Sequence, residues 1–291
     1  MQATKPLSLR ASFIWAFILN RGKQTNERVA NARSKAPNIS VVIPTLNEAQ
    51  NLPHMLPKIP AWVNEVLIVD GHSTDNTIKV ARQLRPDARI LMQKRSGKGD
   101  ALRCGFDAAT GDIIVMLDAD GSTDPTEIPA FTSALLAGAD YAKGSRFMQG
   151  AGTSDISLFR KLGNWGLLTL ARFFFGGSFS DLCYGYNAFW RDVLPQLNLD
   201  GDGFEIEAIM NVRALRARLD IVEVPSFEHD RVYGTSRLRA IPDGWRVLKA
   251  IVREAWLEFR PLPSLAGARQ ELQPRDADSA QVAVAAKVRS M

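Results

Sequence analysis

The sequence lacks the features that mark several specialised classes of protein. It has only two cysteines, Cys104 and Cys183, too few for a disulfide framework, and we interpret both as buried thiols in a reducing compartment. No apolar run approaches the roughly 20 residues that a membrane-spanning helix needs. A G-x-G-x-x-G fingerprint after a strand and a G-x-x-x-x-G-K-[ST] phosphate loop are both absent. These absences argue against a disulfide scaffold and against the two commonest nucleotide-binding motifs.

The charge and length leave several kinds of partner open. The chain has 291 residues and a formal net charge of +5, which is compatible with a nucleic acid, an anionic membrane or a phosphorylated substrate. A short apolar run at 13–19 follows Lys5 and Arg10 but has no small-residue cleavage site after it. We therefore expect residues 1–37 to be an extension with a short membrane-associating segment, or a helix packed on the domain, rather than a secretion signal.

Apolar runs alternate with helical patterns over about 100 residues. The buried strands predicted from these runs are 39–43, 65–70, 88–92 and 112–117. Helices are predicted around 48–56 and at 75–84, 100–109 and 125–136, and this alternation calls for a mostly parallel sheet with right-handed crossovers. After Gly144 the regularity fails, and we expect helices at 158–175, 205–215 and 242–259 and a strand at 219–224.

Acidic residues stand where the predicted strands end. Asp118 and Asp120 follow the fourth strand, Asp70 ends the second, and the segment 44–48 follows the first. Ligands bind at this edge of an open α/β sheet, and paired carboxylates suit a hard divalent cation that bridges to phosphates. An isolated D-x-D sequence is more often an ordinary polar turn at the end of a strand. The functional interpretation therefore depends on the other acids that follow neighbouring strands. Lys98 in a Gly-Lys-Gly break either reaches a phosphate or is an ordinary exposed loop lysine.

Four motifs together resemble family 2 glycosyltransferases with the GT-A fold. They are Val-Ile-Pro-Thr-Leu-Asn-Glu at 42–48, Val-Asp-Gly-His-Ser-Thr-Asp-Asn-Thr at 69–77, Gly-Lys-Gly at 97–99 and Leu-Asp-Ala-Asp-Gly at 117–121. Later segments are similar to the polyprenyl-phosphate branch of that family, which is dolichol-phosphate mannosyltransferase-like: 143–147, 181–189, 204–207 and 227–238. The resemblance covers roughly 39–238.

The resemblance implies a Rossmann-like sheet flanked by helices, with acceptor-side helices in the C-terminal part. It implies a nucleotide sugar of the GDP-mannose or UDP-glucose type, Mg²⁺ or Mn²⁺, and inversion at the anomeric carbon. By motif, the nucleotide-binding residues would be Pro44, Asn47, Glu48, Asp70, Ser73, Lys98 and Asp118. Asp118 and Asp120 would hold the metal and serve catalysis. Arginines for the acceptor phosphate would be Arg146, Arg160, Arg231 and Arg237, each of which taken alone would pass for a solvated surface residue.

The acceptor decides whether a base is needed. A phosphate monoester is already an anion at neutral pH, because its second pKa is near ~6. A hydroxyl acceptor would need a carboxylate, and we expect Glu205 as this catalytic residue, with Asp202 and Glu207 as further candidates. The branch often has Gln at the position of Ser122, where a hydroxyl or a water would have to replace it.

The expected organisation is an extension at 1–37, a GT-A domain at 38–240, a C-terminal helix at 241–262 packed on the domain and a disordered tail at 263–291. We expect a cytoplasmic enzyme held peripherally at the inner face of an anionic membrane, through 13–19 and the helix at 165–175. Two alternatives are a saccharide or small-molecule hydroxyl acceptor, and a non-enzymatic basic module for lipid or nucleic acid. Nucleic acid is disfavoured because the acids at the sheet edge would repel its phosphates.

Overall fold

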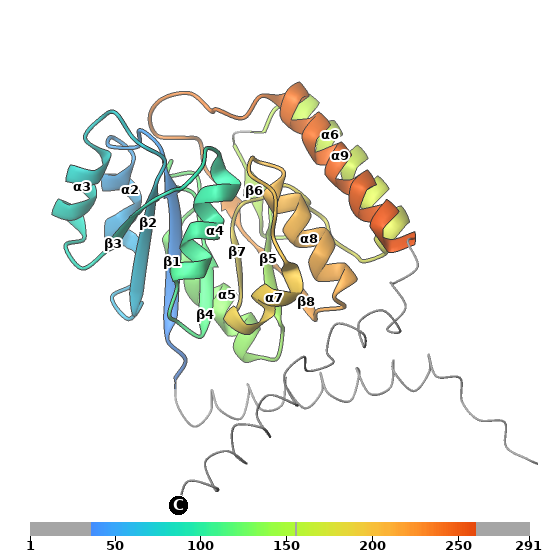
Figure 1. Ribbon diagram of the computed structural model, residues 1–291, viewed down its shortest axis with the longest axis horizontal. Helices are drawn as coiled ribbons and strands as arrows, with labels where there is room; N and C mark the ends of the chain where they lie inside the picture. Colours follow the sequence, from blue (N-terminus) through green and yellow to red (C-terminus); the bar gives the residue numbers. More distant parts are fainter. Residues whose placement is uncertain (1–35, 155, 260–291) are drawn as a thin grey trace, which may run out of the picture. The chain divides into compact units, whose positions relative to one another are not determined.

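A computed structural model describes residues 36–154 and 156–259 (Figure 1). The chain divides into two compact units, 1–254 and 255–291, and the first unit contains all the features discussed below. The expected tail at 263–291, the apolar run at 13–19 and nearly all of the extension at 1–37 lie outside the described residues. Within the described ranges, no helix is long and apolar enough to cross a membrane.

The first unit is built on a seven-stranded sheet with the strand order β3-β2-β1-β4-β7-β5-β8. Its strands are β1 Ile39–Thr45, β2 Glu65–Asp70, β3 Arg89–Met92, β4 Ile113–Met116, β5 Tyr141–Ser145, β7 Asn187–Trp190 and β8 Ile221–Pro225. β7 runs antiparallel to both β4 and β5, and the other neighbouring pairs are parallel. A second, two-stranded sheet pairs β6 Gly152–Thr153 with β9 Phe227–Glu228.

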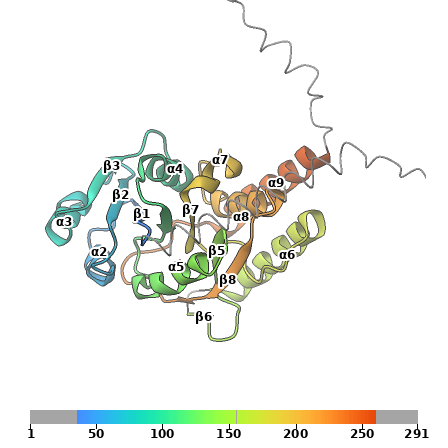
Figure 2. The same ribbon diagram turned by 90° about the horizontal axis from the view of Figure 1, so that it is seen from below.

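Helices cover both faces of the sheet. They are α2 Leu52–Met55, α3 Thr77–Leu84, α4 Lys98–Ala108, α5 Ile128–Leu136, α6 Leu158–Phe175, α7 Leu194–Leu197, α8 Ile206–Arg216 and α9 Ala240–Phe259, with short 3-10 turns η1 Leu56–Lys58, η2 Pro125–Glu127 and η3 Arg191–Val193. Figure 2 shows α4 and α7 on one face and α2 and α5 on the other. This is the mostly parallel α/β architecture that the alternation of apolar runs predicted.

Two hydrophobic cores hold the unit together. The larger one contains the central strands, and β4 is buried along its whole length, as expected for a parallel strand covered on both faces. A smaller core joins α6, α8 and α9 through Leu168, Ala171, Ala208, Val212, Val247 and Ile251, together with Phe179 and Leu182. We call it the α6–α8–α9 cluster.

Two strands of the sheet were not predicted. β5 contains Lys143 and Gly144 and so shows no apolar run, yet every residue in it is buried. The ammonium of Lys143 donates to the carbonyl of Gly144 at 3.0 Å and lies 6.0 Å from the Phe179 ring centroid. β7 has only four residues, Asn187–Trp190, and its antiparallel pairing depends on partners distant in the sequence.

Candidate functional site

A cavity of about 240 Å³ lies at the carboxyl edge of the sheet, where β1 and β4 end. It brings together most of the residues singled out from the sequence: Pro44, Glu48, Lys98, Asp118, Asp120, Arg146, Arg160, Arg231 and Arg237. The most distant of these side chains, Pro44 and Arg237, are 193 positions apart in the chain. The side chains that follow β1 and β4 meet because parallel strands end at one edge of the sheet. Asn47, Asp70, Ser73 and Glu205 do not line the cavity.

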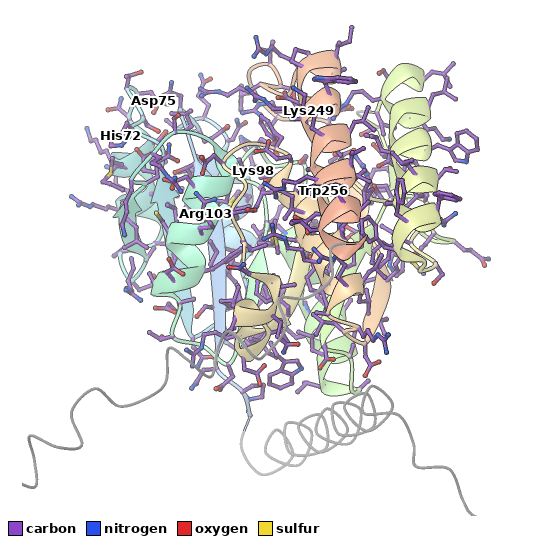
Figure 3. The ribbon with its side chains drawn as sticks, turned by 45° about the vertical axis from the view of Figure 1, so that its right-hand side comes forward. His72, Asp75, Lys98, Arg103, Lys249 and Trp256 are labelled. Carbon is purple, nitrogen blue, oxygen red and sulfur yellow. The ribbon has the colours of Figure 1, made fainter. Side chains whose placement is uncertain are left out.

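Lys98 bridges two carboxylates inside the cavity. Its ammonium lies 2.5 Å from Asp118 Oδ1 and 2.5 Å from Glu207 Oε1, and Figure 3 labels it at the start of α4. Burial alone would lower the pKa of Lys98, but these two carboxylates raise it above its ordinary value. Burial raises the pKa of Glu207, with Lys98 acting in the opposite direction. Lys98 is therefore a fixed positive charge that neutralises crowded acids, rather than the exposed loop lysine of the alternative interpretation.

Gly185 makes room for this group. A Cβ at this position would lie 2.8 Å from Asp118 Oδ2 and 2.9 Å from Glu207 Oε1, so any larger residue would displace the carboxylates. No feature of the sequence pointed to this role beyond the position of Gly185 inside the 181–189 motif. Glu207, one of the two further candidate bases, lines the cavity, whereas Glu205, the acid expected first, does not.

Arg231 bridges the second pair of acids. Its Nη1 lies 3.1 Å from Asp120 Oδ2, and its other amino group contacts Glu48. Asp120 Oδ1 also accepts hydrogen bonds from the backbone N–H of Ser122 at 3.0 Å and from its hydroxyl at 2.7 Å. Ser122, which replaces the Gln common in the branch, thus positions the second acid of the D-x-D motif. Burial raises the pKa of Glu48, and Arg231 and Asn51 partly oppose this.

Arg146 has a different environment from the other arginines. Its Nε and Nη2 donate to the two oxygens of Asp181 at 2.7 and 3.0 Å, and its Nη1 donates to Glu228 at 3.0 Å. Asp181 is fully buried, and although burial alone would raise its pKa, Arg146 holds that pKa below its ordinary value. The expected role of Arg146 as a phosphate-binding residue is not what these contacts support. They make it the centre of a buried ionic cluster in the cavity wall.

Three predicted nucleotide-binding residues do not line the cavity but are hydrogen-bonded to one another next to it. Asp70 is fully buried and accepts hydrogen bonds from the Ser73 N–H at 2.7 Å and from the Ser73 hydroxyl at 2.6 Å. The Ser73 hydroxyl in turn accepts a hydrogen bond from the N–H of Asn47 at 2.8 Å. The backbone of Asn47 is left-handed, with a φ of 55°. This network joins the segment that follows β1, where Pro44 and Glu48 line the cavity, to the end of β2.

Two of the three candidate bases lie away from the cavity. Glu205 accepts a hydrogen bond from the N–H of Gly203 at 2.9 Å. Its other oxygen is buried and has no hydrogen-bond partner among the described residues. Asp202 forms ion pairs with Arg95 at 3.3 Å and with Arg103, which Figure 3 labels on α4. Of the three, Glu207 is therefore the carboxylate that a bound acceptor could reach.

The two cysteines are free, and each residue as a whole is partly exposed. Cys183 lines the cavity. Burial of its sulfur, reinforced by Asp181 and Glu207, raises the pKa of Cys183 to about 12. The thiol is therefore protonated at neutral pH and is not a nucleophile.

Asp118 and Asp120 fit a divalent cation only in part. Both are carboxylates that line the cavity, the kind of oxygen ligand that Mg²⁺ and Mn²⁺ accept. Over residues 36–154 and 156–259, however, no group of three or more His, Cys, Asp or Glu side chains is arranged to hold a metal. A cation here would therefore draw its remaining ligands from a bound diphosphate and water, as Mg²⁺ sites for phosphorylated substrates commonly do.

The family model for glycosyl transferase family 2 matches residues 40–197. The chain belongs to glycosyltransferase family 2. It is 33% identical over 211 residues to the polyprenol monophosphomannose synthase of Mycolicibacterium smegmatis, covering 68% of this chain and 80% of the relative. It is 31% identical over 210 residues to the dolichol-phosphate mannosyltransferase of Pyrococcus furiosus, covering 69% of this chain and 59% of the relative. The expected family 2 membership, in its dolichol-phosphate mannosyltransferase-like branch, is confirmed.

Solved structures agree on the fold of this family 2 enzyme. Glucosyl-3-phosphoglycerate synthase from Mycobacterium tuberculosis, crystallised with Mn²⁺, uridine diphosphate and glucosyl-3-phosphoglycerate, superimposes with a TM-score of 0.62 at 24% identity. The match covers 78% of this chain and 83% of that one, which confirms the expected GT-A fold. The protein is thus a glycosyltransferase, and the non-enzymatic binding module considered from the sequence is set aside.

Proposed function

We propose that this glycosyltransferase transfers a hexose from a nucleoside-diphosphate sugar to a polyprenyl phosphate, with inversion and with Mg²⁺ or Mn²⁺ bound. The observation that carries the proposal is that one cavity is lined both by the carboxylates of Asp118 and Asp120, just after β4, and by Arg160 and Arg237 from later segments. A metal-bound diphosphate suits the acidic part, and a second phosphate suits the basic part.

The donor would lie against the ends of β1 and β4. Pro44 and Glu48 would face the nucleoside, and Asp118 and Asp120 would hold the divalent cation. When bound, that cation would neutralise the charge that grows on the departing nucleoside diphosphate. Lys98 remains bound to Asp118 and Glu207 and limits the repulsion between these carboxylates and the diphosphate.

The acceptor side needs positioning more than it needs a base. A polyprenyl phosphate is an anion at neutral pH, and an arginine can hold it through two parallel hydrogen bonds while one of its oxygens faces the anomeric carbon. Arg160 in the first turn of α6 and the exposed Arg237 line the cavity and are suited to this task. Arg231 would join them after exchanging Asp120 and Glu48 for the phosphate.

A hydroxyl acceptor is the second candidate. Glu207 lines the cavity, and burial raises its pKa, which are properties of a possible general base. Its ion pair with Lys98 counts against this role, because the ammonium competes for the proton-accepting oxygen.

The test is turnover of a panel of radiolabelled GDP- and UDP-sugars with Mg²⁺ or Mn²⁺, with and without a short polyprenyl phosphate, measured by partition into organic solvent. We expect label in the organic phase only when the lipid is present, and the labelled donor would identify the sugar. Donor consumption that stays in the aqueous phase, with no dependence on the lipid, would overturn the proposed acceptor and make Glu207 the base to test.

A further inference from the structure

Gln93 is a buried residue whose side-chain amide borders the cavity without a partner. It follows β3, is 7% exposed and lines the cavity. Its backbone N–H donates to the carbonyl of Asp70 at 3.0 Å, and its own carbonyl lies 3.2 Å from Nε2 of His72. The side-chain amide, in contrast, makes no hydrogen bond within residues 36–154 and 156–259. Because a buried amide without a hydrogen bond is unfavourable, one at the wall of a cavity is suited to a ligand that completes it.

Asp70, the acid expected to bind the nucleotide, is in the opposite situation. It is fully buried and does not line the cavity. Its Oδ1 accepts hydrogen bonds from the hydroxyls of Ser73 at 2.6 Å and Thr45 at 3.3 Å, and its Oδ2 accepts from the N–H of Ser73 at 2.7 Å. Both oxygens therefore already have partners. Between Glu48 and Gly97, the described residue that lines the cavity is Gln93.

Gly71 leaves room for the Gln93 amide beside the end of β1. A Cβ at residue 71 would lie 3.3 Å from Gln93 Oε1 and 3.3 Å from the carbonyl oxygen of Thr45. The amide therefore lies against the backbone of Gly71 and close to Thr45, which lines the cavity together with Pro44 and Leu46. All these side chains are uncharged. This part of the cavity suits a neutral ring with a hydrogen-bonding edge better than it suits a phosphate.

The strand order sets the distance between Gln93 and the acids of the D-x-D motif. Gln93 follows β3 and Asp118 follows β4, and Figure 1 shows β3, β2, β1 and β4 side by side. Three strand spacings separate β3 from β4 in this order, or roughly 14 Å at ~4.8 Å each. An extended nucleoside diphosphate has the edge of its base at one end and its terminal phosphate at the other. It can therefore reach from Gln93 to Asp118 across the ends of β2 and β1.

We propose that Gln93 reads the base of the donor nucleotide through its side-chain amide, in place of the saturated Asp70. This inference rests on the proposed function, whose donors carry uracil or guanine. Both bases have a carbonyl oxygen beside a ring N–H. The amide can donate from Nε2 to that carbonyl and accept the ring N–H at Oε1, a paired contact that a diphosphate alone cannot make.

The test is calorimetric binding of UDP, GDP and inorganic pyrophosphate to the full chain, with Mn²⁺ and without acceptor. The wild type should bind one of the two nucleoside diphosphates more tightly than pyrophosphate. Gln93→Leu nearly keeps the size of the side chain but removes its donor and acceptor. It should weaken binding of the preferred nucleotide by about tenfold or more, the value of a paired contact to a base edge. Pyrophosphate binding should stay unchanged, which also shows that the variant is folded.

Gln93→Glu distinguishes the two bases, because a carboxylate only accepts hydrogen bonds. The ring N–H of uracil stands between two carbonyl oxygens, which would face the carboxylate. An enzyme that takes uridine nucleotides should therefore lose about as much affinity as in Gln93→Leu. Guanine has an amino group beside its ring N–H, and both donate, so an enzyme that takes guanosine nucleotides should keep most of its affinity for GDP. The reverse pattern would contradict pairing through the amide.

Gln83→Leu is the matched control. Gln83 is exposed on α3 and does not line the cavity, so the same substitution there should change none of the three affinities. In turnover, Gln93→Leu should raise the donor KM and leave kcat unchanged, since the base lies away from the reacting carbon.

Three results would refute the proposal. The first is wild-type affinity of Gln93→Leu for the preferred nucleotide. The second is an equal loss for nucleotide and pyrophosphate, because the amide would then support the site without reading the base. The third is a wild type that binds neither UDP nor GDP more tightly than pyrophosphate. Because binding is measured without acceptor, failure of the polyprenyl acceptor would be seen separately in the turnover assay.

Discussion

Replacing Arg146 by Met tests whether this arginine holds the fold or the substrate. The side chains of Arg146 and Asp181 are 4% and 0% exposed, so the substitution would leave the Asp181 carboxylate buried without its cation. Removing one partner of a buried ion pair costs about 3–5 kcal/mol. For a unit of this size each kcal/mol lowers the melting temperature by roughly 2–4 °C, so we expect a fall of roughly 6–20 °C.

The pH dependence gives a second readout of the same pair. Because Arg146 holds the pKa of Asp181 below its unfolded value, the carboxylate contributes stability that is fully present above about pH 4. That contribution is lost as the pH falls through the folded pKa. In Arg146→Met, burial without the cation should raise the pKa of Asp181, so the variant should be destabilised most at neutral pH and approach the wild type in acid.

The assay is thermal unfolding followed by circular dichroism between pH 3 and 8. Arg146→Met/Asp181→Asn should recover part of the loss, because it removes the uncompensated charge. Arg237→Met, at an exposed arginine of the cavity, should change stability by less than about 0.5 kcal/mol and act on the acceptor KM. If Arg146→Met unfolded like the wild type and changed only the acceptor KM, the structural role would be refuted and the phosphate-binding role restored.

Three further substitutions test the bridged acids. Asp120→Ala should lower metal-dependent turnover by about 10²-fold or more, because it removes a charge that would bind the cation; unchanged activity would take Asp120 out of the mechanism. Arg231→Gln should tighten Mn²⁺ binding, measured by calorimetry, by about fivefold, because it removes a partly exposed ion pair worth ~1 kcal/mol. The same variant should raise the acceptor KM. Weaker Mn²⁺ binding would contradict competition between Arg231 and Mn²⁺ for Asp120. Lys98→Met should lower the melting temperature and leave Glu207 protonated at neutral pH, which infrared titration of the carboxyl band would detect; a band that stays ionised would contradict the buried pairing.

The sequence predicted the wall of the cavity at the ends of β1 and β4 better than the opposite wall, for a physical reason. Strands β1, β2 and β4 are continuous apolar runs with acids after them, so periodicity alone placed Asp118 and Asp120 at one edge of the sheet. The opposite wall depends on contacts between distant segments. The pairing of Arg146 with Asp181 joins residues 35 positions apart, and β7 fits between β4 and β5 against their chain order.

The positions of single residues in this opposite wall could also not be predicted from sequence patterns. Glu205 and Glu207 are two positions apart at the start of α8, so their side chains leave the helix in different directions, and only that of Glu207 lines the cavity. Lys143 concealed a strand, because a buried lysine satisfied by a backbone carbonyl looks polar in the sequence. The environment of such a residue depends on the residues that contact it in the folded chain, and sequence patterns do not identify those residues.

Lys98 and Arg231, which are paired with the acids of the D-x-D motif, differ in how firmly their backbones are held. Lys98 is the first residue of α4. The N–H of its neighbour Gly99 donates a hydrogen bond to the carbonyl of Asp202 at 2.8 Å, so the backbone at Lys98 is held both by the helix and by this bond. Arg231 belongs to an irregular segment between β9 and α9. A divalent cation arriving with the diphosphate would therefore displace Arg231 from Asp120 and leave Lys98 in place. Under the proposed function, the released Arg231 would be available to the acceptor phosphate when the donor is bound. That coupling predicts that the acceptor binds more tightly after the metal and the nucleotide than before them.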